Sequence, residues 1–106
     1  MYNRFLLGTI KIDPAVKRLL GREPLDLVSR HAVCDFGLVS DHHVHANAVA
    51  LAEGRAITSE YAADPTDPLQ GRIRVVTNDG WATTHVSWIP APKPRKKTEP
   101  KDELPF

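Results

Sequence analysis

The sequence has few of the features that mark secreted, membrane or disulfide-bonded proteins. It has a single cysteine, Cys34, so no internal disulfide can form and no oxidising compartment is needed. No apolar stretch approaches the roughly 20 residues that span a bilayer, and the apolar run near the N-terminus is too short for a signal peptide. We therefore expect a cytoplasmic protein that does not associate with membranes.

Common catalytic motifs and a basic folded surface are also lacking. There is no phosphate-binding P-loop, no G-x-S-x-G elbow and no H-E-x-x-H zinc motif. Five of the 14 basic and three of the 13 acidic residues fall in 91–106, which leaves nine basic against ten acidic in 1–90. Nucleic-acid-binding domains concentrate positive charge on their folded surface. We expect at most weak, salt-sensitive nucleic-acid binding, through the segment that holds Lys96 and Lys97.

The distribution of apolar side chains predicts one small domain over residues 1–90, with a boundary at Pro90. Residues 91–106 read APKPRKKTEPKDELPF and contain four of the nine prolines. A segment with so few apolar side chains cannot bury enough surface to offset the entropy of ordering. We therefore expect a disordered Pro- and Lys-rich tail.

Residues 1–90 have the pattern of an α+β fold, with three short helices packed on a three- to four-stranded antiparallel sheet. The first helix is expected after Asp13-Pro14, the second from about Pro24 to before Gly37, and the third between its cap Ser40 and Gly54. Strands are expected over 5–12, 56–61, 72–77 and 81–88, with a hairpin turn at Asn78-Asp79-Gly80. Helical spacing assigns to the core Leu25, Val28 and Ala32 in the second helix, and Val44, Ala48 and Leu51 in the third.

The densest set of polar residues lies between Arg30 and Tyr61. His31 and Asp35 near the end of the second helix suggest a histidine held by a carboxylate, which is the core of general base catalysis. Asp35 is equally able to pair with Arg30 and tie the helix end to a loop, and the lack of a nucleophile motif favours this structural interpretation. Asn47 and Tyr61 can each hydrogen-bond toward residues 30–37, which would make one polar network inside the fold.

Three histidines at the start of the third helix raise the question of a metal site. His43 points roughly 100° away from His42 on a helix, so these two and His45 cannot converge without a distant ligand. A solvated helix turn is the favoured interpretation, with His45 pairing with Asp41. We expect no metal ion and no cofactor.

Cys34 follows His31 by three residues, the spacing of a Cys–His nucleophile pair on a helix. Its place near a helix C-terminus opposes this chemistry, because the partial negative charge there disfavours a thiolate. A buried, unreactive Cys34 is the favoured interpretation.

The two tryptophans of the last expected strand are seven residues apart, so they should point to opposite faces. Trp88 alternates with Val86 and is expected in the core. Trp81 lies beside the hairpin, where it is either an exposed anchor for a partner or packed over the sheet edge. The packed position is the favoured one.

Several short blocks occur in a fixed order across residues 5–90: Phe5-x-Leu7-Gly8, Asp13-Pro14, Arg30-His31, Asp35-Phe36-Gly37, Asn47-x-x-Ala50-Leu51-x-x-Gly54, Ser59-x-Tyr61 and Thr77…Thr83-Thr84. In these blocks the chain resembles a family of small plasmid-related proteins of bacterial mobile elements, often labelled type I restriction–modification subunits. It departs from the family at Phe36, where the family has Trp, and at Asn78-Asp79-Gly80-Trp81, where the family has a charged turn containing Arg. The resemblance implies an accessory protein of mobile DNA. It does not imply a methylating subunit, which needs a larger α/β domain with a Gly-rich turn.

Two functional hypotheses follow. In the first, favoured one, the protein is non-enzymatic and binds a host or plasmid protein complex, such as a defence or restriction system, through Arg30, Trp81, Lys96 and Lys97. In the second, it is a small RNase-like or toxin-like enzyme that uses His31, Asp35, Asn47 and His85 for acid, base and phosphate contacts. The second hypothesis requires a cleft that holds His31, Asp35 and His85 within hydrogen-bond reach.

Overall fold

A computed structural model describes residues 3–91 of the 106-residue chain, so nearly all of the expected tail lies outside the described part. The class is α+β, with three short helices and a four-stranded sheet, as predicted. The boundary expected at Pro90 stays a prediction. Within residues 3–91 no helix is long and apolar enough to cross a membrane.

The elements in chain order are β1 (Thr9–Ile12), α1 (Pro14–Leu20), α2 (Leu25–Ala32), α3 (Asp41–Glu53), β2 (Ile57–Ala62), the 3-10 turn η1 (Pro68–Gln70), β3 (Arg72–Thr77), the 3-10 turn η2 (Asp79–Trp81) and β4 (Thr83–Ile89).

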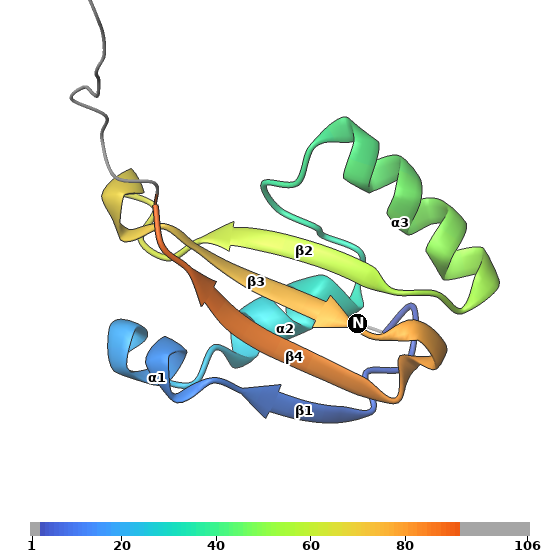
Figure 1. Cartoon of the computed structure of the whole chain (residues 1–106), viewed down its shortest axis with the longest axis horizontal. Coiled ribbons are helices and arrows are strands. Elements are labelled where there is room, and N and C mark those ends of the chain that lie inside the picture. The colour runs from blue at the N-terminus through green and yellow to red at the C-terminus, as the bar shows by residue number, and fades with distance from the viewer. Residues whose placement is uncertain (1–2, 92–106) are drawn as a thin grey trace, which may run out of the picture.

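The strand order in the sheet is β1-β4-β3-β2 (Figure 1). β3 pairs antiparallel with both β2 and β4, but β1 runs parallel to β4, with Thr9 opposite Thr83. The sheet is therefore mixed, and the expectation of a purely antiparallel sheet is wrong. Hairpin signals report only on strands that are neighbours in the chain. They carry no information on the direction of a first strand that pairs with the last.

The first strand is also shorter than expected, because it begins at Thr9 and not at Phe5. Gly8 adopts a left-handed conformation (φ +64°) directly against the backbone of Ala82, where no side chain would fit. The preceding chain turns away from the sheet plane and buries Phe5 in the core. Gly8 therefore ends the extended segment.

In the described part of the chain, residues 3–91, the helices leave one face of the sheet uncovered (Figure 1). Figure 1 shows α2 behind the strands with α1 close by, while α3 lies alongside the outer edge of β2. The side chains of β2 alternate accordingly, since Ile57, Ser59 and Tyr61 are buried and the residues between them are partly exposed. The core under the sheet has two clusters. The larger contains Val16, Leu27, Val28, Tyr61, Ile73, Val75 and Val86, and the smaller contains Phe5, Ala50 and Ile57.

Two of the predicted helix faces are rotated from their expected positions. In α2, Val28 and Ala32 are buried as predicted, but Leu25 is 56% exposed and Leu27 takes its place. In α3 the buried residues are Asn47 and Ala50. The prediction for Val44 and Ala48 is wrong, because both are exposed, and Leu51 is only partly buried. α3 meets a sheet edge rather than a sheet face, so only a narrow stripe of the helix is covered.

The segment before α3 covers part of the outer edge of β2. The N–H of Glu60 donates to the Phe36 carbonyl (3.1 Å), and its carbonyl accepts from the N–H of Leu38 (2.6 Å). Gly37 has φ +71°, and a Cβ there would lie 2.6 Å from Cδ1 of Tyr61 and collide with the Glu60 carbonyl. Only glycine fits this crossing point.

We predict that Gly37→Ala destabilises the protein by about 3–5 kcal/mol, because the left-handed backbone and the steric clash both oppose a Cβ. Gly54→Ala is the matched control: φ is +72°, but nothing lies within 4 Å of the added Cβ, so about 1–2 kcal/mol is expected. Urea unfolding followed by tryptophan fluorescence measures both. Equal losses in the two variants would show that the contact with β2 is not tight.

Candidate functional site

His31 lies at the centre of a fully buried chain of hydrogen bonds. Its Nδ1 is 2.6 Å from Oγ of Ser59 in β2, and its Nε2 is 2.9 Å from Oγ1 of Thr77 in β3. Thr77 is in turn 2.7 Å from Oγ1 of Thr84 in β4, which donates to the Leu7 carbonyl at 2.6 Å. One helix, three strands and the N-terminal segment are thus joined by side-chain hydroxyls and one imidazole.

The proton positions in this chain follow from its last acceptor. Because Thr84 donates to a carbonyl, it accepts from Thr77, and Thr77 accepts from Nε2–H of His31. Nδ1 then accepts from the hydroxyl of Ser59. Burial lowers the pKa of His31 to about 4. A neutral imidazole that uses both nitrogens inside the core holds the fold together and has no free nitrogen to offer a substrate.

Asp35 pairs with Arg30 and not with His31. Nε of Arg30 donates to Oδ2 of Asp35 at 2.7 Å, and the guanidinium lies 4.6 Å from the centroid of the Tyr61 ring. The hydrogen bond from Arg30 lowers the pKa of the Asp35 carboxyl. The Tyr61 hydroxyl donates to the Asp35 carbonyl (2.5 Å), and burial raises the pKa of Tyr61 to about 12. The predicted helix-to-loop tie is confirmed, and the His31–Asp35 dyad is not formed.

The side-chain amide of Asn47 bonds the edge of β2 as the backbone of a neighbouring strand would. Its side-chain amide donates to the Thr58 carbonyl (2.7 Å) and accepts from the Thr58 N–H (3.0 Å) at the outer edge of β2. The expectation that Asn47 bonds toward residues 30–37 is therefore wrong. A polar residue inside this helix serves the sheet edge, because an edge N–H and C=O that are removed from water need partners.

His85 is on the opposite side of the sheet from His31. Its neighbours in β4, Thr84 and Val86, face the core, so His85 points to the uncovered face. There its Nε2 lies 2.6 Å from Oδ1 of Asp13, with both side chains about half exposed. Asp13 makes no side-chain cap to α1, contrary to expectation. The four residues of the enzymatic hypothesis thus occupy four separate places: the core (His31), the exposed end of α2 (Asp35), the edge of β2 (Asn47) and the outer face (His85).

The tryptophans are both engaged through their ring nitrogens. Trp81 is partly buried in η2, where its indole N–H donates to the Arg55 carbonyl (2.9 Å). Its ring packs against Phe5, with 5.5 Å between the two ring centroids. It is therefore not the free partner anchor considered above, and the packed alternative is confirmed. Trp88 packs against the larger core cluster, as predicted, and donates to the Gln70 carbonyl. Lys96 and Lys97 lie outside the described residues.

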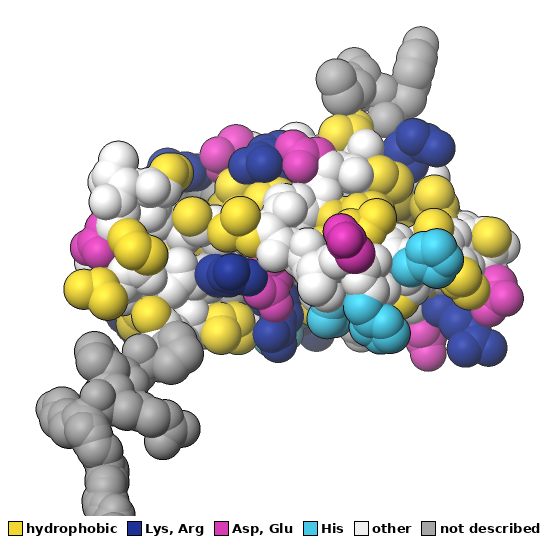
Figure 2. Space-filling view, turned by 90° about the horizontal axis from the view of Figure 1, so that it is seen from above, with side chains coloured by type: hydrophobic (Ala, Val, Ile, Leu, Met, Phe, Trp, Pro, Cys, Tyr) yellow, Lys and Arg dark blue, Asp and Glu magenta, His cyan; other side chains and the backbone are white. Residues whose placement is uncertain are grey.

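The histidines of α3 do not assemble a metal site. Figure 2 shows histidine side chains on the surface at the α3 end of the molecule. His43 approaches its own helix cap, with Nδ1 3.2 Å from Oγ of Ser40, and no bond between His45 and Asp41 forms in the described part of the chain. Within residues 3–91 no group of three or more His, Cys, Asp or Glu is placed to hold a metal ion.

Cys34 is half-buried beside the smaller core cluster, in a left-handed conformation with φ +66°. Burial raises the pKa of its thiol. The protonated thiol is a poor nucleophile, which agrees with the interpretation of Cys34 as an unreactive packing residue.

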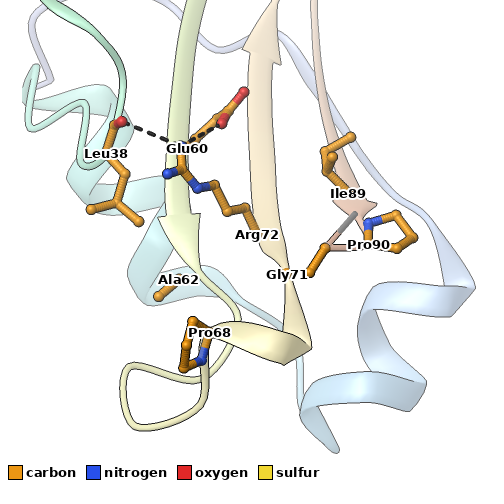
Figure 3. A pocket seen from close by; sticks show the side chains of 9 residues that line it. Leu38, Glu60, Ala62, Pro68, Gly71, Arg72, Ile89 and Pro90 are labelled. Atoms are coloured by element: carbon orange, nitrogen blue, oxygen red, sulfur yellow. Dashed lines mark hydrogen bonds and ion pairs between the residues drawn. The ribbon is translucent and has the colours of Figure 1, made fainter. Parts of the chain in front are cut away.

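Sequence reasoning missed a groove on the uncovered face. It has a volume of about 480 Å³ and lies where β2, β3 and β4 reach η1 (Figure 3). Arg72 crosses it from β3, donating to Oε1 of Glu60 (3.2 Å) and to the Leu38 carbonyl (3.3 Å). The groove was not predicted because its walls come from four distant parts of the chain. They are Leu38, Glu60, Ala62, Pro68, Gly71, Arg72, Ile89, Pro90 and Ala91.

At the groove, the carboxylate of Glu60 lies beneath the guanidinium groups of Arg72 and Arg74. Glu60 is only 16% exposed, whereas Arg72 and Arg74, which both bind it, are 48% and 42% exposed. Burial alone would raise the pKa of Glu60, but the hydrogen bonds from Arg74 and Arg72 outweigh it and lower that pKa. Arg72 and Arg74 alternate along β3, next to Glu60 in β2. This alternation of arginines is the one signal in the sequence that indicates a charged surface here.

Comparison of the chain with protein-family models, curated proteins and solved structures found no match.

We predict that His31 makes the protein less stable in mild acid. Its folded pKa of about 4 lies below the ordinary value of 6.5, so the unfolded chain binds the proton first as the pH falls. Stability is therefore unaffected by this group above pH 6.5 and is lost as the pH falls from 6.5 to 4, by about 2 kcal/mol at pH 5 and about 3 kcal/mol in full. Urea unfolding of wild type and His31→Gln at pH 7, 6 and 5 checks this. The two chains should differ in slope, and parallel pH profiles would contradict the assignment.

We predict that Asn47→Ala costs about 2–3 kcal/mol, because the Thr58 N–H and carbonyl both lose their partner. Asn47→Asp should fall between wild type and Asn47→Ala, since a carboxylate still accepts from the N–H but donates nothing. Ala48→Ser, at the exposed neighbouring position, serves as the control. Thermal and urea unfolding measure the series, and an Asn47→Ala loss no larger than that of Ala48→Ser would exclude the strand-like role.

Proposed function

We propose that the protein is a small, non-enzymatic accessory protein of bacterial mobile DNA that binds a protein complex of the host or plasmid in the cytoplasm. A defence or restriction complex is the candidate partner. The genetic context rests on the family resemblance of the blocks between residues 5 and 90. The binding function rests on the groove of the uncovered sheet face.

The groove is the observation that carries the proposal. It combines apolar walls, such as Leu38 and Ile89, with the guanidinium of Arg72, and lies on a sheet face that no described helix covers. Arginine among apolar side chains is the composition of protein–protein interfaces. Arg72 therefore replaces Trp81 as the proposed anchor.

The arrangement of polar residues gives less support to an RNase-like or toxin-like enzyme. His31 is neutral, buried and bonded through both nitrogens, and His85 lies on the other side of the sheet. General acid–base catalysis needs both groups within reach of one substrate. The charge balance gives little support to nucleic-acid binding by the folded part, because residues 1–90 hold nine basic against ten acidic residues.

We predict that Leu38→Asp abolishes capture of a partner complex, because it places a charge on the apolar groove wall. Leu38 is 49% exposed and Val49, on the outside of α3, is 51% exposed, so Val49→Asp is a matched control. Tagged wild type and both variants are used as baits in a lysate of a bacterial host at low and moderate salt. Retained proteins are measured by mass spectrometry, after thermal unfolding has shown that the baits are folded.

Wild type and Val49→Asp should retain the same complex near stoichiometric amounts, and Leu38→Asp should retain at least about tenfold less. No retained protein, or equal retention by all three baits, would refute the proposal. Nuclease assays with His31→Ala as the inactive control would then test the enzymatic alternative.

A further inference from the structure

The outer edge of β2 is protected at two positions and open at the third. Thr58, Glu60 and Ala62 direct their N–H and C=O groups away from β3, because the Ala63 N–H donates to the Gly71 carbonyl and the alternation follows from there. Asn47 satisfies Thr58, and residues 36–38 satisfy Glu60. No hydrogen bond made within residues 3–91 reaches the outward groups of Ala62.

Residues 3–91 leave this position open. Continuing the pairing of residues 36–38 would bring the Leu38 carbonyl to the Ala62 N–H, but that carbonyl accepts from Arg72 instead. Beyond Leu38 the backbone turns away toward α3. An unpaired N–H and C=O at a sheet edge are the groups that another extended chain uses to add a strand.

Two pockets flank Ala62, one on each side of the sheet. The groove of about 480 Å³ lies on the uncovered side, and a second pocket of about 320 Å³ lies on the helix side. Ala62 and Leu38 line both of them. Side chains of an extended strand point alternately to opposite faces, so a strand paired with Ala62 would direct neighbouring side chains into the two pockets. Nucleic acid lacks backbone N–H and C=O groups with side chains alternating on two faces, so it cannot pair with a sheet edge in this way.

The accessible charge is positive around the groove and nearly balanced around the second pocket. Arg72 lies over the largely covered Glu60 in the groove, whereas Arg22 and Arg30 on the helix side pair with the equally exposed carboxylates of Asp26 and Asp35. Each of these arginines is about half exposed and already bonded to one carboxylate, which leaves further N–H donors free to point outward. An acidic side chain is the complementary group for the groove, where Arg72 is the more exposed member of its ion pair.

We propose that the edge of β2 at Ala62 is a peptide-binding site that adds a short, extended, acidic segment of the partner to the sheet. The inference rests on the proposed binding function and gives it a site and a ligand class. Backbone pairing at Ala62 supplies the docking geometry, and the two flanking pockets, with Arg72 at the groove, select the side chains.

The test begins with selection of random nonapeptides, displayed on phage, against the full chain. The selected peptides are synthesised with a fluorescent label, and their binding is measured by anisotropy. Ala62→Pro is the decisive variant, because it removes the outward N–H, whereas the hydrogen bonds to β3 are made by the neighbouring residues. Arg72→Gln tests the charge, and Val49→Asp is the control.

Selected peptides should carry Asp or Glu within an alternating apolar pattern. Ala62→Pro should weaken binding at least about tenfold, Arg72→Gln should weaken it several-fold with loss of the acidic preference, and Val49→Asp should leave it unchanged. Amide hydrogen exchange gives a second readout in the unmodified chain: exchange of the Ala62 amide should slow at least tenfold when peptide binds. This readout stands even if Ala62→Pro fails to fold.

Failure takes three recognisable forms. The site is overturned if no peptide is selected. It is also overturned if the peptides bind Ala62→Pro as they bind wild type and leave the exchange of the Ala62 amide unchanged. Neither result affects the proposed function, which the bait experiment with Leu38→Asp tests separately. Self-association of the full chain that Ala62→Pro abolishes would make a second copy the occupant, which also overturns the inference. Loss of partner capture by all baits would refute the proposed function, whatever the peptides do.

Discussion

The hydrogen-bonded chain through His31 is the interaction on which the rest of the structure depends. A buried imidazole is acceptable only when both nitrogens are paired, and here the two partners come from different strands. Because the chain continues through Thr84 to the Leu7 carbonyl, it fixes α2 against β2, β3 and β4 and also holds the N-terminal segment. Apolar packing gives the two core clusters most of their stability, but this polar row between them determines how the helix and strands are aligned.

Because the polar residues between Arg30 and Tyr61 make structural contacts, we look for the functional site on the surface. Arg30, Asp35 and Tyr61 tie the end of α2 to the sheet, and Asn47 completes a sheet edge. Each of these side chains thus already serves a structural contact. What remains accessible is the uncovered face and the open end of β2, where apolar walls and arginine lie side by side. Recognition of another protein is the activity that we propose for this surface.

Local signals in the sequence were enough for the class and most element boundaries. Pro14, Ser40 and Gly54 mark helix ends because their chemistry acts within one turn. The parallel pairing of β1, the burial of Asn47 and the groove walls depend on residues far apart in the chain, on which periodicity is silent. His31 illustrates the limit: its type suggested catalysis, and only the hydroxyls of Ser59 and Thr77 identify it as part of the core.

The pairing of β1 with β4 has a consequence for synthesis of the chain on the ribosome. Thr9 in β1 lies opposite Thr83 in β4, so the N-terminal strand has no partner until the last strand has left the exit tunnel. The polar chain through His31 needs Thr84 and is also completed only then. Contacts of such long sequence separation slow folding. Nascent chains should therefore stay partly open until almost the whole domain has emerged, with the edge of β3 exposed to chaperones and proteases in the meantime.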